Sequence, residues 1–274
     1  MSENRKVKKA EYDVVVIGGG MAGICAALAS ARHGARTALV HDRHVLGGNA
    51  SSEIRMHICG ASENLAKPEL EESGILHEIM LDNKSRNDYF NYSIWDMVLF
   101  TAVKSQPHLT VYLMEDCRME GNEIREIDAY QLTTETHWQI RGNIFIDCTG
   151  NATLGYYAGA EYRTGSEGRA EFNEPDAPEQ ANNDRMGNTL LFKAVDRGHS
   201  VNFKRPKIAR HFTEEELKYR THSAVHEAKT KGDVDKAYLR MTSYSTSSVD
   251  YGYWWIELPG KTEDIIDEYE GIRD

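Results

Sequence analysis

Residues 12–23 read YDVVVIGGGMAG, and this stretch decides the fold of the chain. The apolar run at residues 14–17 predicts a short buried strand that ends in a glycine turn and leads into a helix. The turn carries the pattern G-x-G-x-x-G at Gly18, Gly20 and Gly23. In a dinucleotide-binding unit the first glycine permits the tight turn, the second leaves room for a pyrophosphate, and the third lets the helix pack on the strand. The free N–H groups of the helix N-terminus then face the phosphates.

The sequence after the turn completes a βαβ unit. The segment GICAALASARHG, residues 23–34, is apolar on most faces, as expected of a helix that is packed on more than one side. Gly34 ends this helix, and residues 36–40 supply a second strand. Glycine turns without a ligand are common, but one inside a complete unit of this length predicts that a dinucleotide binds.

The composition is that of an ordinary globular protein of 274 residues, of which 40% are hydrophobic. The formal net charge of −11 opposes general attraction to nucleic acid or anionic membranes, so neither is expected as a partner. Basic residues near the N-terminus predict a solvated tail at residues 1–10. We see no signal peptide or membrane span and expect a cytoplasmic protein. The four cysteines form no C-x-x-C pair, so no metal site is expected.

A turn-rich stretch at residues 41–61 follows the second strand and has the composition of a ligand loop. A dinucleotide-binding unit normally carries an acid about 20 residues beyond the glycines, where it accepts hydrogen bonds from the adenosine ribose. Asp42 stands at about that distance, but His41 is the residue directly after the apolar strand. The ribose contact is therefore predicted for Asp42 or His41. Asp42 is favoured because a carboxylate accepts two hydroxyl hydrogen bonds and a neutral imidazole only one.

Helical and extended patterns then alternate. Residues 68–83 and 92–106 have helical spacing, and the apolar run at residues 109–114 predicts a third strand. Alternation over residues 117–138 predicts an antiparallel meander.

The meander leads into a second ligand-like edge. Gly142-Asn143 predicts a turn, and residues 143–147 predict a short apolar strand after it. This strand ends in Thr149-Gly150 before a new helix, which repeats the geometry of the opening turn.

From about residue 162 the composition changes, and glycine, acidic residues and asparagine become frequent. We therefore predict a nucleotide-binding domain at residues 11–161 and a substrate domain at residues 162–274. Within the second part, residues 213–230 have the pattern of a capped helix, and residues 251–255 that of a strand with an aromatic face.

Together these motifs resemble the FAD-dependent oxidoreductases of the glutathione-reductase-like superfamily. The resemblance rests on the opening turn, the loop LGGNASSE at residues 46–53, the meander, and FIDCTGNATLGYYAGA at residues 145–160. More narrowly, the chain is similar to a family related to fumarate-reductase-type flavoproteins and heterodisulfide reductase flavin subunits. The resemblance implies an α/β fold: a Rossmann-like FAD-binding domain with an inserted β-meander, followed by part of an α+β substrate domain.

The resemblance also implies roles for individual residues. The family pattern puts Gly18, Gly20 and Gly23 on the pyrophosphate, Gly47, Gly48, Asn49 and Ser51 near the flavin, and Thr149 and Gly150 beside the dinucleotide. Two positions depart from the pattern, because the family usually has glutamate in place of His41 and often aspartate in place of Asn151. Relatives also carry a C-terminal glycine-and-acid segment that residues 165–274 lack, so we expect a truncated chain.

Arg55, His57 and Cys59 alternate just past this loop, so an extended backbone would place them on one face. In a flavoenzyme such residues could serve as a proton donor, an anion clamp or a covalent flavin link, and a scaffold role is equally open. Our hypothesis is that Arg55 and His57 are catalytic, handling a proton while a hydride passes between a small-molecule substrate and the flavin. Two other functions stay open, an NAD-linked dehydrogenase and a non-catalytic dinucleotide-binding subunit.

Overall fold

The structure is a computed structural model of the chain, and it divides into two units, Met1–Tyr162 and Arg163–Asp274. The division falls next to the boundary predicted at residues 161 and 162, and the substrate-domain role of the second unit stays a prediction. The residues that the structure describes are 7–56, 58, 73–88, 91–113, 116–118, 123–184, 189–195, 199, 202, 204–207, 211, 213 and 251–257.

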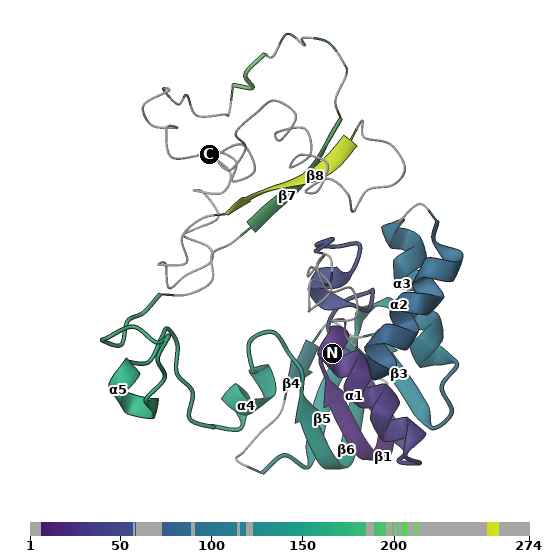
Figure 1. Cartoon of the computed structure of the whole chain (residues 1–274). Coiled ribbons are helices and arrows are strands. Elements are labelled where there is room, and N and C mark those ends of the chain that lie inside the picture. The colour runs from purple at the N-terminus through teal and green to yellow at the C-terminus, as the bar shows by residue number, and fades with distance from the viewer. Residues whose placement is uncertain are drawn as a thin grey trace. The chain divides into compact units, whose positions relative to one another are not determined.

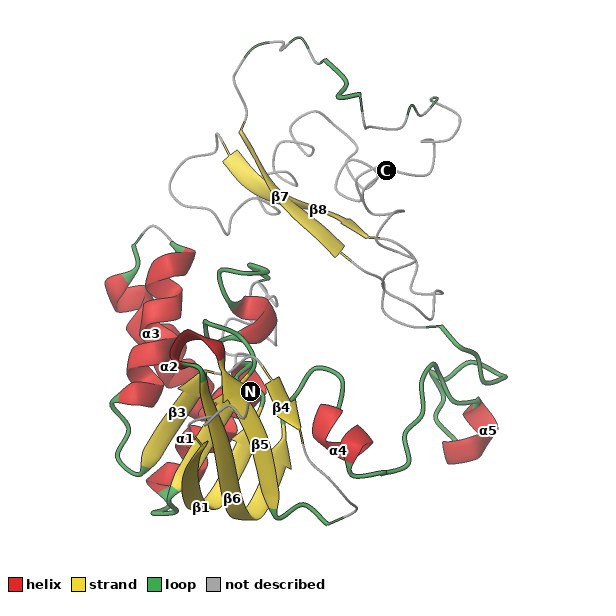
Figure 2. Ribbon diagram, turned by 180° about the vertical axis from the view of Figure 1, so that it is seen from behind, coloured by secondary structure: helices red, strands yellow, loops and turns green. Residues whose placement is uncertain are grey.

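The first unit is built on a six-stranded sheet with the order β3-β2-β1-β6-β5-β4. Its strands are β1 (Val7–Ile17), β2 (Thr37–His41), β3 (Leu109–Leu113), β4 (Asp116–Arg118), β5 (Glu126–Gln131) and β6 (Thr136–Asp147). Strands β3, β2, β1 and β6 are parallel, and β5 and β4 continue the sheet antiparallel. The carboxyl ends of β1, β2 and β6 therefore meet at one edge (Figure 2). This confirms the predicted Rossmann-like α/β fold.

Three helices cover one face of the parallel strands (Figure 1): α1 (Met21–Arg32), α2 (Gly74–Arg86) and α3 (Tyr92–Lys104). Helix α1 buries Ile24, Ala27, Leu28 and Ala31, which recur every three or four residues and so form one stripe. In the core beneath the helices this stripe meets Leu99 of α3, which is fully buried.

The other face of the parallel strands packs against the meander. Tyr112 on β3 contacts the ring of Trp138 on β6, with 4.9 Å between ring centroids, and the hydroxyl groups of Tyr12 and Tyr112 are hydrogen-bonded at 2.7 Å. Because β2 and β1 lie between β3 and β6 in the sheet, the Tyr112–Trp138 contact requires the sheet to curl toward its own meander. Ile127 and Ile140 are buried inside this curl.

Two sequence predictions about β1 and β6 are wrong. Residues 7–10 were assigned to a solvated tail, but β1 begins at Val7 and these residues pair with β6. Gly142-Asn143 forms no turn, because β6 runs unbroken through it, and Gly142 pairs with Tyr12. A Cβ on Gly142 would lie 2.6 Å from Cγ2 of Val15, so glycine here serves close packing.

The remaining elements are short: the 3-10 turns η1 (Gly48–Ala50) and η2 (Leu132–Thr134), the helices α4 (Thr153–Tyr157) and α5 (Arg169–Phe172), and the antiparallel strands β7 (Thr189–Val195) and β8 (Tyr251–Glu257). Strand β8 confirms the predicted strand at residues 251–255, and its aromatic face stays a prediction. The helix predicted at 213–230 lies outside the described residues apart from its first position.

The α3 core contact gives a stability test. Leu99→Ala should lower the free energy of unfolding by about 2–5 kcal/mol, because it leaves a cavity among fully buried side chains. Leu81→Ala is the matched control, since Leu81 on α2 is 51% exposed and should cost less than about 1 kcal/mol. Urea denaturation followed by circular dichroism measures both, and equal losses would contradict this assignment of the core.

Candidate functional site

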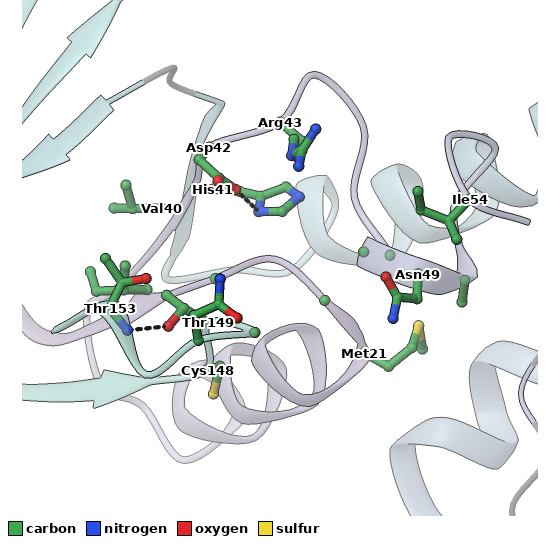
Figure 3. Close-up of a pocket in the computed structure, with 18 of the residues that line it drawn as sticks. Met21, Val40, His41, Asp42, Arg43, Asn49, Ile54, Cys148, Thr149 and Thr153 are labelled. Atoms are coloured by element: carbon green, nitrogen blue, oxygen red, sulfur yellow. Dashed lines mark hydrogen bonds and ion pairs between the residues drawn. The ribbon is translucent and has the colours of Figure 1, made fainter. Parts of the chain in front are cut away.

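A pocket of about 770 Å³ opens at the sheet edge where β1, β2 and β6 end. Its walls come from four segments of the first unit: the glycine turn, the end of β2, the loop with η1, and the segment from the end of β6 into α4 (Figure 3). These are the segments that the sequence singled out as ligand loops.

The three glycines of the opening turn have different surroundings. Gly18 has a φ of +97°, and a Cβ there would lie 2.4 Å from the carbonyl oxygen of Cys148. A Cβ on Gly23 would lie 1.8 Å from the carbonyl oxygen of Gly18, so both positions require glycine for contacts within the protein. A Cβ on Gly20 would meet nothing within 4 Å, and the same holds for Gly150 across the pocket. Protein packing therefore does not explain glycine at these two pocket positions.

The end of β2 separates the two candidates for the ribose contact. His41 is only 5% exposed, and its Nδ1 accepts a hydrogen bond of 2.9 Å from the N–H of Gly19. Burial lowers the pKa of His41 and favours the neutral ring, so its 3.3 Å approach to the Asp42 carboxylate is a contact rather than an ion pair (Figure 3). The Asp42 side chain is 64% exposed and lines the pocket.

The loop after β2 is fastened directly to the glycine turn. Gly47 donates its N–H to the carbonyl of Gly19 at 2.8 Å, and Gly47 and Gly48 both have positive φ. Asn49 lines the pocket, as Gly47 and Gly48 do. Ser51 does not: it is fully buried, and its Oγ accepts a hydrogen bond from the N–H of Glu53 at 3.2 Å. Ser51 therefore supports the loop from beneath.

An acid that the sequence analysis missed organises the end of β6. Asp147 accepts hydrogen bonds from the backbone N–H and Oγ1–H of Thr149, at 2.9 and 2.7 Å, and from the N–H of Gly155 at 3.0 Å. Thr149 Oγ1 in turn accepts from the N–H of Thr153 at 2.7 Å. Burial acts to raise the pKa of Asp147, but these bonds outweigh it and lower the pKa overall. The available signal was an acid that ends an apolar strand two residues before Thr-Gly.

Arg55 differs from its expected setting. It has a φ of +63°, so the extended backbone predicted there is wrong. Its Nε donates to the carbonyl of Ser52 at 3.0 Å, and its own carbonyl accepts from the hydroxyl of Tyr92 at 2.6 Å. Its neighbours at positions 53, 54 and 56 line the pocket, whereas Arg55 does not. His57 and Cys59 lie outside the described residues.

Within the part of the chain that the structure describes, no group of three or more His, Cys, Asp or Glu residues could hold a metal ion. No helix in that part is long and apolar enough to cross a membrane.

A protein-family comparison decides the class. The model of a family described as FAD dependent oxidoreductase matches residues 13–271. The chain belongs to this family. Its cofactor is FAD, as the resemblance implied, and its general class is that of FAD-dependent oxidoreductases.

Solved structures of flavoproteins are also similar over part of the chain. The HOCl-induced flavoprotein disulfide reductase RclA from Escherichia coli, in its Cu(II) complex, is 20% identical, with a TM-score of 0.34, and the match covers 51% of this chain and 29% of that one. L-proline dehydrogenase from P. horikoshii is 18% identical over 54% of this chain and 24% of that one, with a TM-score of 0.32. Sdh1 from Mycobacterium smegmatis is 14% identical over 52% and 34%, with a TM-score of 0.36. This chain covers well under two thirds of each, and the family assignment rests on the family match.

The pocket has the features that FAD requires. Helix α1 starts at its rim with no side chain capping it, so N–H groups of the first turn are available to phosphate oxygens. The open space over Gly20 allows a pyrophosphate to approach the backbone closely. The residues present therefore fit the cofactor of the family.

The hydrogen bonds to Asp147 predict a pH dependence of stability. Because the pKa of Asp147 is lowered in the folded state, its contribution is present above the unfolded-state pKa and is lost as the pH falls through the folded-state pKa. Asp147→Asn should lower the free energy of unfolding by about 1 kcal/mol at neutral pH, and the difference from the wild type should shrink as the pH falls through the folded-state pKa. Urea denaturation across this range measures it, with Asp128→Asn, at an exposed position, as control. A pH-independent difference would contradict the assignment.

Proposed function

We propose that this chain binds FAD in the pocket at the ends of β1, β2 and β6, and that a hydride passes between a small-molecule substrate and the flavin. The observation that carries the proposal is the open space over Gly20 beside the uncapped start of α1. Both features leave room and hydrogen-bond donors for a pyrophosphate. The bound flavin supplies the redox chemistry.

Each predicted cofactor residue has a proposed part in this arrangement. Gly18 and Gly23 shape the turn, and Gly20 admits the pyrophosphate. Asp42 accepts hydrogen bonds from the ribose, since its exposed carboxylate lines the pocket while Nδ1 of His41 is already engaged. The remaining residues border the dinucleotide or support the loops beside it: Gly47, Gly48, Asn49, Ser51, Thr149 and Gly150.

For the proton, the proposal keeps His57 as the donor or acceptor and Arg55 as an anion clamp. This part rests on the sequence, because His57 lies outside the described residues and Arg55 does not line the pocket.

Gly20→Val tests the cofactor site. The side chain would fill the space proposed for the pyrophosphate, so FAD binding should weaken by more than about a hundredfold, or about 2.7 kcal/mol. The free energy of unfolding without FAD should change by no more than about 1 kcal/mol, because Gly20 has φ −67° and a Cβ there meets no protein atom. Ala22→Val is the control, since Ala22 is exposed on the same turn of α1 and does not line the pocket. Flavin absorbance retained through gel filtration measures binding, and a yellow Gly20→Val protein would overturn the site.

Anaerobic flavin reduction tests the reaction. Mixing the FAD-loaded protein with NADH, or with a panel of small alcohols, amines and hydroxy acids, should bleach the oxidised flavin with at least one reductant. His57→Ala should slow that step by about a hundredfold or more without changing FAD affinity. His77→Ala, at a histidine of α2 that does not line the pocket, is the matched control. If the protein binds FAD fully but none of these reductants bleaches the flavin, the result would favour a non-catalytic dinucleotide-binding subunit.

A further inference from the structure

His41 connects the end of β2 to the glycine turn. Its Nδ1 accepts the N–H of Gly19 at 2.9 Å, across 22 positions of sequence. The ring lies so close to the turn that a Cβ on Gly19 would be 2.6 Å from Cγ of His41 and 2.7 Å from Cδ2 of Leu46. The orientation of the Gly19 peptide, directly before Gly20 and the start of α1, therefore depends on this imidazole.

The hydrogen bond requires one protonation state. Nδ1 accepts only when it carries no proton, so the neutral ring has its hydrogen on Nε2, which is buried and has no hydrogen-bond partner in the described part of the chain. Protonation would make Nδ1 a donor facing the Gly19 N–H. Oδ1 of Asp42 lies 3.3 Å from Nδ1 and could then accept its hydrogen.

The groups around His41 shift its pKa in opposite directions. Burial lowers the pKa of His41, while the carboxylates of Asp42 and Glu53 and the backbone of Val45 act to raise it. Arg43 acts with burial to lower it. The neutral ring is thus favoured near neutral pH, and acid is needed to charge it.

We propose that neutral His41 is a positioning residue for FAD: it holds the Gly19 peptide so that the backbone at Gly20 and the first turn of α1 faces the pocket. Protonation releases the turn and turns the Asp42 carboxylate toward the imidazolium. The inference rests on the proposed binding of FAD at this turn. Both changes weaken FAD binding, so the dissociation constant should rise as the pH falls through the pKa of His41, by up to about tenfold per pH unit.

The experiment is a titration of the apoprotein with FAD, followed by quenching of flavin fluorescence, from about pH 8 down to the lowest pH at which the apoprotein stays folded, because the pKa of His41 is lowered. The wild type should lose affinity toward the acid end. His41→Asn keeps an acceptor near the position of Nδ1 but does not titrate, so it should bind within about threefold of the wild type at the alkaline end and show a flat profile. His41→Leu removes the acceptor and should bind about tenfold more weakly at every pH. His33→Asn, at an exposed histidine at the far end of α1, should keep the wild-type profile.

Two results would overturn the inference while leaving the cofactor in place: a flat wild-type profile, or tighter binding in acid, as expected if a cationic imidazole attracted the pyrophosphate. A His41→Asn profile that follows the wild type would do the same. Absence of FAD binding at every pH would overturn the inference together with the cofactor site. If His41→Leu does not fold, the wild type and His41→Asn still decide, and their thermal unfolding without FAD checks that both are folded.

Discussion

The structure depends on the close approach of three backbone segments at the end of β1. Gly18 passes so near Cys148 at the end of β6, and Gly23 so near Gly18, that a methyl group fits at neither glycine. This approach lets α1 lie directly on β1 and brings its N-terminus to the sheet edge. The loop after β2 then hydrogen-bonds to the same turn through Gly47 and Gly19. We therefore expect a larger residue at Gly18 or Gly23 to displace the neighbouring walls of the pocket as well as the turn itself.

The pocket offers backbone groups more than charged side chains. Its turn, the η1 loop and the end of β6 are each held by hydrogen bonds among themselves, as in the set that Asp147 accepts from Thr149 and Gly155. A chain with a formal net charge of −11 does not attract a dinucleotide through its overall field. The backbone dipoles at the start of α1 act only over about one helical turn. At that short distance they can attract a phosphate group even though the net charge of the chain is negative. In the proposed site, an anionic cofactor is therefore held by short-range interactions with the backbone.

Local patterns predicted the parts of the fold that short-range rules govern. The opening βαβ unit, α3, β3 and β8 could be read from periodicity, and the resemblance identified the family. Gly142-Asn143 has the composition of a turn, yet pairing with β1 on both sides of it keeps β6 extended, because ten paired positions outweigh a local preference. The buried place of His41 could not be predicted either, since it arises from a contact with Gly19 that forms only when β1 and β2 pair. The left-handed backbone at Arg55 likewise depends on a tertiary contact, the hydroxyl of Tyr92.

In the proposed site, His41 accepts the N–H of Gly19 and Asp42 contacts the ribose, whereas a single acid at the end of β2 would have to do both. A buried carboxylate in the place of the imidazole could also accept the Gly19 N–H, but it would put a negative charge beneath the turn that we propose faces the pyrophosphate. A neutral imidazole accepts the same hydrogen bond without that repulsion. The negative charge lies instead on the next residue, Asp42, whose carboxylate is exposed to water. We propose that hydroxyl groups of the ligand replace this water. In the proposed site, the support of the turn by His41 is separate from recognition of the ligand by Asp42, and we propose that both depend on the protonation state of the buried imidazole.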